Sequence, residues 1–218
     1  MKPSAREIAP SAPLPTLDYE RRYWSDNVIV AGIDEVGRGA LAGPVVAAAV
    51  VFHPSRIPEG IDDSKRLTAE RRVELAAQII DAATSYSFAL VDNARIDSVN
   101  ILQATFDAMH GAIGGLTISP GRLLIDGNRF RSHEVPHTTI VRGDAASVSI
   151  AAASIIAKVV RDAWMREHAH ERFPVYGFSD HKGYGTPEHR RAIVKYGATV
   201  LHRHSFLSKV LAADPWAE

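Results

Sequence analysis

Short apolar or alternating runs are separated by helical patterns through most of this chain of 218 residues. Each run has the length of a strand, and turn residues such as Gly, Pro and Asp separate it from the next element. The five predicted strands cover residues 28–33, 44–52, 86–91, 122–125 and 138–141. The pattern therefore predicts a sheet whose strands are joined partly by helices.

Helices are predicted where a capping residue precedes apolar positions three or four residues apart. Thr68 is a plausible N-cap for a helix that runs to about Ala82, and Ser98 for one that runs to about residue 116. Further helices are expected over residues 147–172 and 186–196, followed by a short C-terminal helical segment. This order of elements favours an α/β fold with a mixed sheet over a sandwich or a helical bundle.

The first 27 residues differ from the rest. Prolines interrupt them, at Pro3, Pro10, Pro13 and Pro15, and such a density prevents a continuous helix or ladder. We expect residues 1–27 to form a poorly ordered tail, with its closing aromatic residues free to pack on the domain, and residues 28–218 to form one domain. No apolar run reaches the roughly 18 residues of a membrane span.

Composition excludes several classes of protein. Lys plus Arg and Asp plus Glu number 25 each, and there is no cysteine. The zero net charge excludes a wholly basic coat protein, and the lack of cysteine excludes a disulfide framework and a thiolate site. The charge is uneven, however. Residues 158–209 carry ten basic and five acidic side chains, so the remainder has a net charge of −5.

Acidic residues follow three of the apolar runs. Asp34 and Glu35 come after the first run, Asp126 after the fourth, and Asp144 after the fifth. If these strands lie side by side, the carboxylates converge and repel one another, a conflict that a divalent cation such as Mg²⁺ or Mn²⁺ resolves. The alternative for a single Asp-Gly at a strand end is an ordinary turn residue.

Three loops carry residues suited to a phosphate backbone. Gly37-Arg38-Gly39 lacks the following helix of a dinucleotide loop but permits close approach to a phosphate. Ser64-Lys65 precedes a capped helix, and Tyr184 lies between two glycines, where a sugar or base could stack on it. Each also has a plain structural interpretation, as a turn or a solvated helix start. His202 and His204 are candidate metal ligands, although scattered histidines are more often structural.

Taken together, these motifs resemble bacterial ribonuclease HII. The segments that carry the resemblance are residues 32–39, 63–65, 125–127, 143–144, 154–158 and 182–186, in the family's order. The resemblance implies a ribonuclease H-like fold with a five-stranded mixed central sheet and C-terminal helices. It implies cleavage of the RNA strand of RNA–DNA hybrids and incision 5′ of a single ribonucleotide in duplex DNA, leaving 3′-hydroxyl and 5′-phosphate ends.

The resemblance also assigns roles. The catalytic and metal-binding acids would be Asp34, Glu35, Asp126 and Asp144, with Mn²⁺ or Mg²⁺ in a two-metal site. The substrate-binding residues would be Gly37, Arg38, Gly39, Ser64, Lys65 and Tyr184, with Tyr184 sensing the ribose at the RNA–DNA junction. We expect a cytoplasmic monomer that acts without a membrane.

Two other classes of function compete with this hypothesis. A non-catalytic nucleic-acid-binding module would use the basic C-terminal third and Tyr184 but leave the strand-end acids without a role. A phosphotransferase of the actin-like type would need a longer, duplicated chain. Loss of activity with EDTA, and its recovery with Mg²⁺ or Mn²⁺, would distinguish a nuclease from simple binding.

Overall fold

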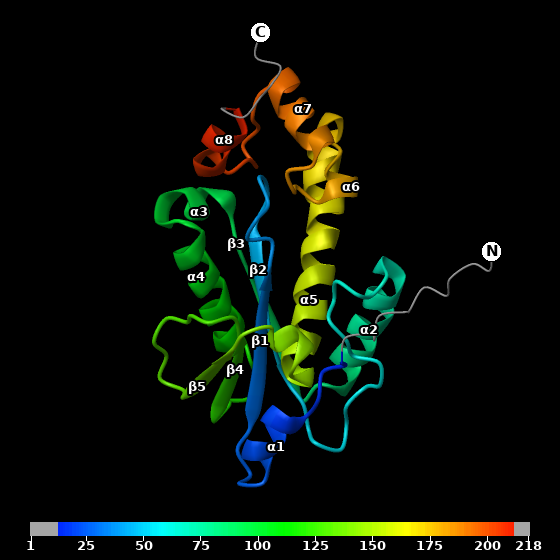
Figure 1. Ribbon diagram of the computed structural model, residues 1–218, viewed down its shortest axis with the longest axis vertical. Helices are drawn as coiled ribbons and strands as arrows, with labels where there is room; N and C mark the ends of the chain where they lie inside the picture. The colour runs from blue at the N-terminus through cyan, green and yellow to red at the C-terminus, as the bar shows by residue number, and fades with distance from the viewer. Residues whose placement is uncertain (1–12, 212–218) are drawn as a thin grey trace, which may run out of the picture.

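A five-stranded sheet forms the centre of the protein, for which a computed structural model describes residues 13–211 (Figure 1). The strand order is β3-β2-β1-β4-β5. The first three strands pair antiparallel, whereas β4 pairs parallel with β1 and β5 parallel with β4. The strands are β1 (Val30–Val36), β2 (Val45–Val51), β3 (Ser85–Val91), β4 (Arg122–Asp126) and β5 (His137–Ile140). The predicted mixed sheet is confirmed.

Helices cover both faces of this sheet, so its central strands are buried on two sides. On one face, α4 (Ile101–Gly114) packs Phe106, Met109 and Ile113 against β1, β2 and β4. On the other, α2 (Ala69–Ala82) and α5 (Val148–Trp164) enclose the alternate residues of β2. Figure 1 shows α4 and α5 on opposite sides of the sheet. Burial on both faces explains why β2 is an uninterrupted apolar run.

Helix α5 lies directly on β1 because Gly32 has no side chain. A Cβ atom at Gly32 would lie 2.2 Å from the backbone carbon of Ser149. The helix begins at its N-cap Ser147, whose hydroxyl accepts a hydrogen bond from the amide of Ile150. This close approach brings the start of α5 to the strand that carries Asp34 and Glu35.

The C-terminal part forms a separate helical layer beyond one end of the sheet (Figure 1). A π-helical turn at Met165–His170 continues α5, and a 3₁₀ turn follows at Pro174–Tyr176. The remaining helices are α6 (Phe178–His181), α7 (Pro187–Tyr196) and α8 (His204–Leu211). Thr186, the first residue of the range 186–196 predicted as a helix, is the N-cap of α7 and accepts a hydrogen bond from the amide of His189.

The predicted helix after Ser98 begins later than expected. Asn100 has a φ of 71° and separates a short helix, α3 (Asn93–Val99), from α4. Its side chain accepts hydrogen bonds from the amides of Leu102 and Gln103, so it is the N-cap of α4. Asparagine adopts a positive φ more often than most residues, which is consistent with the break at this position within an unbroken apolar pattern.

The N-terminal segment also differs from the predicted tail over its described part. Asp18–Trp24 form helix α1, and Glu20 on this helix is fully buried. The Glu20 carboxylate accepts hydrogen bonds from the Ser147 hydroxyl and the Ser149 amide, which ties α1 to the start of α5. The prediction for residues 1–12 lies outside the described residues. Within residues 13–211, no helix has both the length and the apolar character needed to cross a bilayer.

Candidate active site

Four acidic side chains meet near the carboxyl-terminal ends of the neighbouring strands β1 and β4. Because β1 and β4 are parallel, with Ile33 opposite Ile125, the residues that follow, Asp34 and Asp126, lie next to each other. Asp34 and Glu35 are the fifth and sixth residues of β1 rather than residues after it. Asp144 lies in a 3₁₀ turn, Gly143–Ala145, between β5 and α5. The predicted convergence of these acids is therefore present in the fold.

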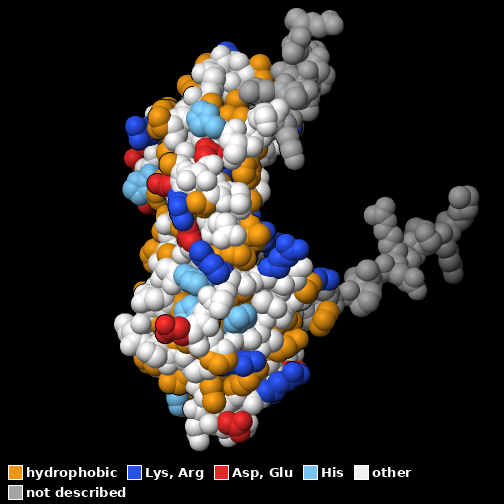
Figure 2. Space-filling view, turned by 90° about the vertical axis from the view of Figure 1, so that its left-hand side faces the viewer, with side chains coloured by type: hydrophobic (Ala, Val, Ile, Leu, Met, Phe, Trp, Pro, Cys, Tyr) orange, Lys and Arg blue, Asp and Glu red, His pale blue; other side chains and the backbone are white. Residues whose placement is uncertain are grey.

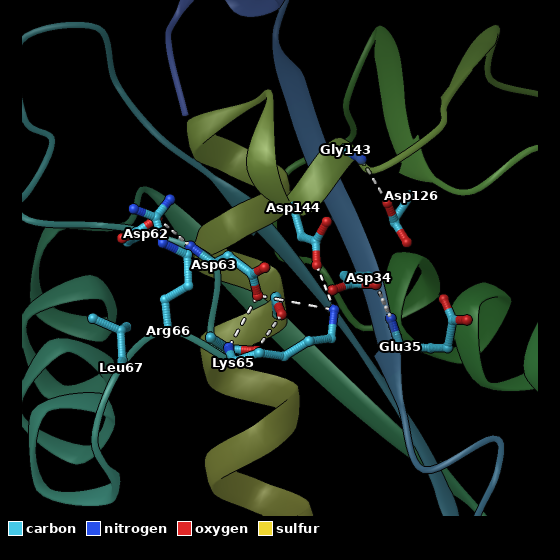
Figure 3. A network of polar contacts seen from close by, with 12 residues as sticks. Asp34, Glu35, Asp62, Asp63, Lys65, Arg66, Leu67, Asp126, Gly143 and Asp144 are labelled. Carbon is cyan, nitrogen blue, oxygen red and sulfur yellow. Dashed lines mark hydrogen bonds and ion pairs between the residues drawn. The ribbon is translucent and has the colours of Figure 1, made fainter. Parts of the chain in front are cut away.

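Three of the acids form a compact group. Oxygen atoms of Asp34, Glu35 and Asp126 lie within 4.8 Å of one another. Asp144 lies beside them, and a hydrogen bond of 2.6 Å from the Gly143 amide to Asp126 Oδ1 joins its turn to β4 (Figure 3). Successive residues of a strand point to opposite faces, so Asp34 and Glu35 approach this group from two sides.

Burial and mutual repulsion disfavour the charged forms of these acids. Burial is the largest cause of the raised pKa of Asp34, which lies well above its usual value, and the charges of Glu35, Asp126 and Asp144 raise it further. The pKa of Asp126 is raised by burial and then by Asp144. Burial also raises the pKa of Glu35, although the nearby guanidinium of Arg38 opposes this. Positive charge from neighbouring side chains therefore does not fully offset the burial and mutual repulsion of these carboxylates.

The donor atoms of this group suit a hard divalent cation. All of them are carboxylate oxygens, the ligands preferred by Mg²⁺ and Mn²⁺. Glu35 Oε2 is buried and has no hydrogen-bond partner among the described residues, which is costly for an ionised carboxylate unless a cation completes its environment. Asp34, Glu35, Asp126 and Asp144 are the residues that could hold such an ion.

Lys65 reaches into the same group from the loop before α2. Its ammonium lies 2.7 Å from Asp144 Oδ2 and 3.9 Å from Asp63 Oδ1 (Figure 3). Ser64, its predicted companion, is placed differently. The Ser64 side chain is buried, and its hydroxyl lies 2.8 Å from that of Ser154 on α5. The structure thus brings Lys65 to the acids, while Ser64 anchors the loop to α5.

The Gly37-Arg38-Gly39 loop follows β1 directly. Arg38 Nη1 donates a hydrogen bond of 3.0 Å to Glu35 Oε1, so this arginine lies at the edge of the acidic group. Gly37 has a φ of 95°, and a Cβ atom there would lie 2.2 Å from Nε of Arg161. Only glycine fits this turn. Beside it, a pocket of about 310 Å³ is lined by Glu35, Arg38 and Asp126, among others.

Tyr184 lies against this loop although it is about 150 residues distant in sequence. The amide of Leu41 donates a hydrogen bond of 2.8 Å to the carbonyl of Gly183, and Ala40 forms an isolated antiparallel bridge with Tyr184. Lys158 Nζ and the Arg161 guanidinium lie 5.9 Å and 5.2 Å from the centre of the Tyr184 ring. The two predicted substrate loops are therefore one continuous surface next to the acids.

Of the two candidate histidine ligands, His202 has a structural role, whereas His204 is exposed and belongs to no metal-ligating group found among the described residues. His202 is fully buried, and its Nδ1 accepts a hydrogen bond from the amide of Thr199. Its Nε2 must therefore carry the proton and donate to His189 Nε2 at 3.1 Å, while His189 Nδ1 donates to the carbonyl of Tyr184 at 3.0 Å. His189 was not singled out from the sequence, although it follows the Tyr184 motif by five residues.

Comparison with known proteins agrees with this geometry. The family model described as Ribonuclease HII matches residues 31–209, which contain all the acids and both loops. The chain belongs to the ribonuclease HII family. Ribonuclease HII of Chloroherpeton thalassium is 53% identical over 193 residues, which cover 86% of this chain and 94% of that protein. Ribonuclease HII of Paracidovorax citrulli is 49% identical over 193 residues, covering 88% of this chain and 80% of that protein.

The fold of this ribonuclease HII is shared with a solved structure. The ribonuclease H2 of Pyrococcus horikoshii OT3 superposes with a TM-score of 0.70 at 27% sequence identity, and the match covers 84% of this chain and 96% of that one. The ribonuclease H-like fold predicted from the sequence is confirmed. Membership of the ribonuclease HII family makes this chain a hydrolase, an endoribonuclease that acts on the RNA strand of RNA–DNA hybrids.

Proposed function

We propose that this ribonuclease HII also incises duplex DNA 5′ of a single embedded ribonucleotide and leaves 3′-hydroxyl and 5′-phosphate ends. The observation that carries this proposal is the hydrogen bond of 2.8 Å from the Leu41 amide to the Gly183 carbonyl. It places Tyr184 and the Gly37-Arg38-Gly39 loop on one surface beside the acids, so that one ribose can contact both. The 2′-hydroxyl distinguishes RNA from DNA at a single position.

The acidic group is the proposed catalytic centre. Asp34 and Asp126 are the central ligands, because they are adjacent across β1 and β4. Glu35 is a further ligand through its unpartnered Oε2, and Asp144 contributes once Lys65 has moved away. When bound, Mg²⁺ or Mn²⁺ would supply Lewis-acid activation of water and of the scissile phosphate.

The surrounding residues orient the nucleic acid. Arg38 is half-exposed at the rim of the acidic group, where its guanidinium can contact a phosphate. Lys65 can exchange Asp144 for a phosphate oxygen, since its side chain is 76% exposed. Ser64 supports this lysine through its contact with Ser154. Gly37 and Gly39 let a ribose approach the backbone closely, and the Tyr184 ring can stack on that sugar.

Figure 2 shows Lys and Arg side chains near the middle of the face that it presents, with Asp and Glu side chains among them. The basic residues that we propose for the phosphates of a duplex are Arg38 and Lys65, which lie at the acidic group. We propose that one protein molecule suffices, because every acid and both loops come from the same chain. The proposed place of action is the cytoplasm, where a nuclease of this kind meets bacterial DNA.

The test is cleavage mapping on a duplex that contains one ribonucleotide, with Mg²⁺ and Mn²⁺ supplied separately. We expect a single cut 5′ of the ribonucleotide, abolished by EDTA and absent from the same duplex made only of DNA. End analysis should show a 3′-hydroxyl and a 5′-phosphate. Cleavage of a long hybrid together with an intact single-ribonucleotide duplex would contradict the proposal while leaving the family activity in place.

A further inference from the structure

Two arginines are fully buried beneath the substrate loops, and neither pairs with a carboxylate in the part of the chain whose side chains are described. Arg161 on α5 and Arg203 before α8 are both 0% exposed. No ion pair joins either to an acid among residues 13–208, the part of the chain whose side chains are described. Two of the ten basic residues of the C-terminal third are therefore directed into the protein rather than toward solvent.

Arg203 holds the segment that follows Gly39. Its Nη1 donates a hydrogen bond of 2.9 Å to the carbonyl of Arg38, and its Nε and Nη2 donate to the carbonyl of Gly43 at 3.0 and 2.9 Å. One planar guanidinium thus joins the two ends of the 38–43 segment, more than 150 residues away in sequence. The amide of Arg203 adds a bond of 2.8 Å to the carbonyl of Leu41.

Arg161 connects that segment with the Tyr184 loop. It donates to the carbonyls of Pro44 at 2.9 Å and Ala42 at 3.2 Å, and also to the carbonyl of Lys182 at 3.0 Å. Its guanidinium lies 5.2 Å from the centre of the Tyr184 ring. The same side chain occupies the space that a Cβ atom at Gly37 would need. Arg161 therefore contacts both substrate loops at once.

Burying two charged guanidinium groups without acidic partners costs free energy, so filling space in the core does not explain why arginines lie here. Burial lowers the pKa of Arg203 to about 9, with the charge of Arg161 as a further cause, and burial lowers the pKa of Arg161 as well. Apolar side chains of similar volume commonly replace buried charges without loss of stability. What they cannot supply is several donors in a fixed plane for carbonyls that no strand pairs.

We propose that Arg161 and Arg203 are positioning residues that hold the 37–44 segment and the Tyr184 loop in their substrate-binding arrangement before nucleic acid arrives. This inference rests on the proposed role of these two loops. The C=O and N–H of a trans peptide point in opposite directions. Since Arg203 draws the carbonyl of Arg38 inward, the N–H of Gly39 points outward, at an exposed residue where a Cβ atom would meet nothing within 4 Å.

The test compares R161K and R203K with the wild type on both substrates, a long hybrid and a single-ribonucleotide duplex. Lysine keeps the charge but cannot bridge two carbonyls in one plane. We expect kcat to fall by about 100-fold, as misplacement of a site by about 1 Å produces. KM should change less than kcat, since Lys65 lies outside the 37–44 segment and can still contact a phosphate. The Mn²⁺ titration should match the wild type, since the four acids also lie outside that segment.

R56K is the matched control, because Arg56 is exposed and pairs only with Asp81 on the surface. It should behave as the wild type. Wild-type kcat in R161K and R203K, or a loss that only follows the fraction of unfolded protein, would overturn the inference. If the wild type cuts hybrids but not the single-ribonucleotide duplex, the proposed function fails, and the same comparison on hybrids still decides the role of the two arginines.

A measurement on the wild type covers the case in which the variants do not fold. In the free protein, the assigned NMR signals of the Arg161 and Arg203 Nε–H groups should exchange at least about 100-fold more slowly than free arginine, as expected for buried hydrogen-bonded donors. Their exchange should be unchanged when substrate binds. Exchange at the rate of free arginine, or protection that appears only with substrate, would contradict an arrangement that exists beforehand.

Discussion

The ammonium of Lys65 lies 2.7 Å from Asp144 Oδ2, across 79 residues of sequence, and so provides a positive charge at the acidic group (Figure 3). Burial alone would lower the pKa of Lys65, but the hydrogen bond to Asp144 and the charges of Asp144, Asp63 and Asp34 raise it. The lysine thus offsets part of the repulsion among the carboxylates, and a divalent cation would have to compete with it.

K65Q should therefore bind Mn²⁺ more tightly than the wild type, by about three- to ten-fold, because one competing charge is gone. The substrate KM should rise, since a phosphate contact is lost as well. Isothermal titration with Mn²⁺ and steady-state kinetics measure the two effects. K195Q is the control, as Lys195 is exposed on α7 and contacts the Tyr196 ring. Weaker Mn²⁺ binding by K65Q would show that Lys65 supports the metal site instead.

D34N should abolish cleavage and yet stabilise the metal-free protein. The pKa of Asp34 is raised in the folded state, so its charge at neutral pH costs stability that an amide does not. Asparagine can still accept the hydrogen bond that Asp34 Oδ1 receives from the Glu35 amide. We expect a gain of about 1–2 kcal/mol in the free energy of unfolding at pH 7 without metal.

This gain has a defined pH dependence. It should be complete above the folded-state pKa of Asp34 and shrink as the pH falls toward about 4, the unfolded-state value, where wild-type Asp34 is protonated in both states. Denaturant titrations between pH 4 and pH 8 measure it. D81N, a change at an exposed carboxylate paired with Arg56, is the control. A D34N protein that is less stable than the wild type at pH 7 would contradict the repulsion inferred for this group.

Most of the sheet and the acidic group could be predicted from the sequence because both depend on local patterns. Buried strands give apolar runs, and Thr68, Ser147 and Thr186 cap the helices that follow them. Parallel pairing of β1 with β4 then brings Asp34 and Asp126 together. The start of α4 could not be placed, because the positive φ of Asn100 leaves no trace in the apolar pattern.

The residues that escaped prediction act over long distances in the sequence. In the sequence, Arg161 looks like a solvent-exposed charge at the end of an apolar helix face. Only the structure shows that it points into the protein and donates hydrogen bonds to the carbonyls of Ala42 and Lys182. Glu20 lies in a segment with a proline-rich composition, and its partners Ser147 and Ser149 are more than 120 residues away. Patterns within one element carry no information about such pairs.

E20A should weaken the attachment of α1 to the start of α5. The Glu20 carboxylate accepts hydrogen bonds from the Ser147 hydroxyl at 2.5 Å and the Ser149 amide at 2.9 Å, and the variant leaves both donors buried without a partner. We expect a loss of about 2–4 kcal/mol in the free energy of unfolding. E20Q keeps an acceptor oxygen and should recover about half of it. Equal stability of E20A and the wild type in denaturant titrations would show that α1 does not contribute.

The buried His189 and His202 should make the protein less stable in acid. Burial lowers the pKa of each ring to about 4, whereas an unfolded histidine titrates near 6.5. Between these values the unfolded chain binds more protons than the folded one, so stability falls as the pH drops from about 6.5 to about 4. Over this pH range, the protonation of each ring in the unfolded chain lowers the free energy of unfolding by at most about 3 kcal/mol.

H189Q tests this assignment, since glutamine can donate to the Tyr184 carbonyl but does not titrate. The free energy of unfolding of H189Q should depend less steeply on pH between 4 and 6.5 than that of the wild type. The difference in slope should correspond to up to about one fewer proton taken up on unfolding. H168Q is the control, because His168 packs beside Trp164 in the π-helical turn and makes no contact with Tyr184 in the described structure. An unchanged slope in H189Q would assign the acid sensitivity to other groups.

Y184A should separate the two substrates of the proposed function. The Tyr184 ring lies beside the Gly37-Arg38-Gly39 loop, so its loss removes the stacking surface for one ribose while the acids and the phosphate contacts remain. We expect incision at a single ribonucleotide to fall by about 10- to 100-fold in kcat/KM, which corresponds to the loss of one stacked contact. A long hybrid offers many alternative registers, so its cleavage should fall much less. Y184F keeps the ring and should retain most activity on both substrates, and equal losses on the two substrates in Y184A would argue against recognition of the junction by this residue.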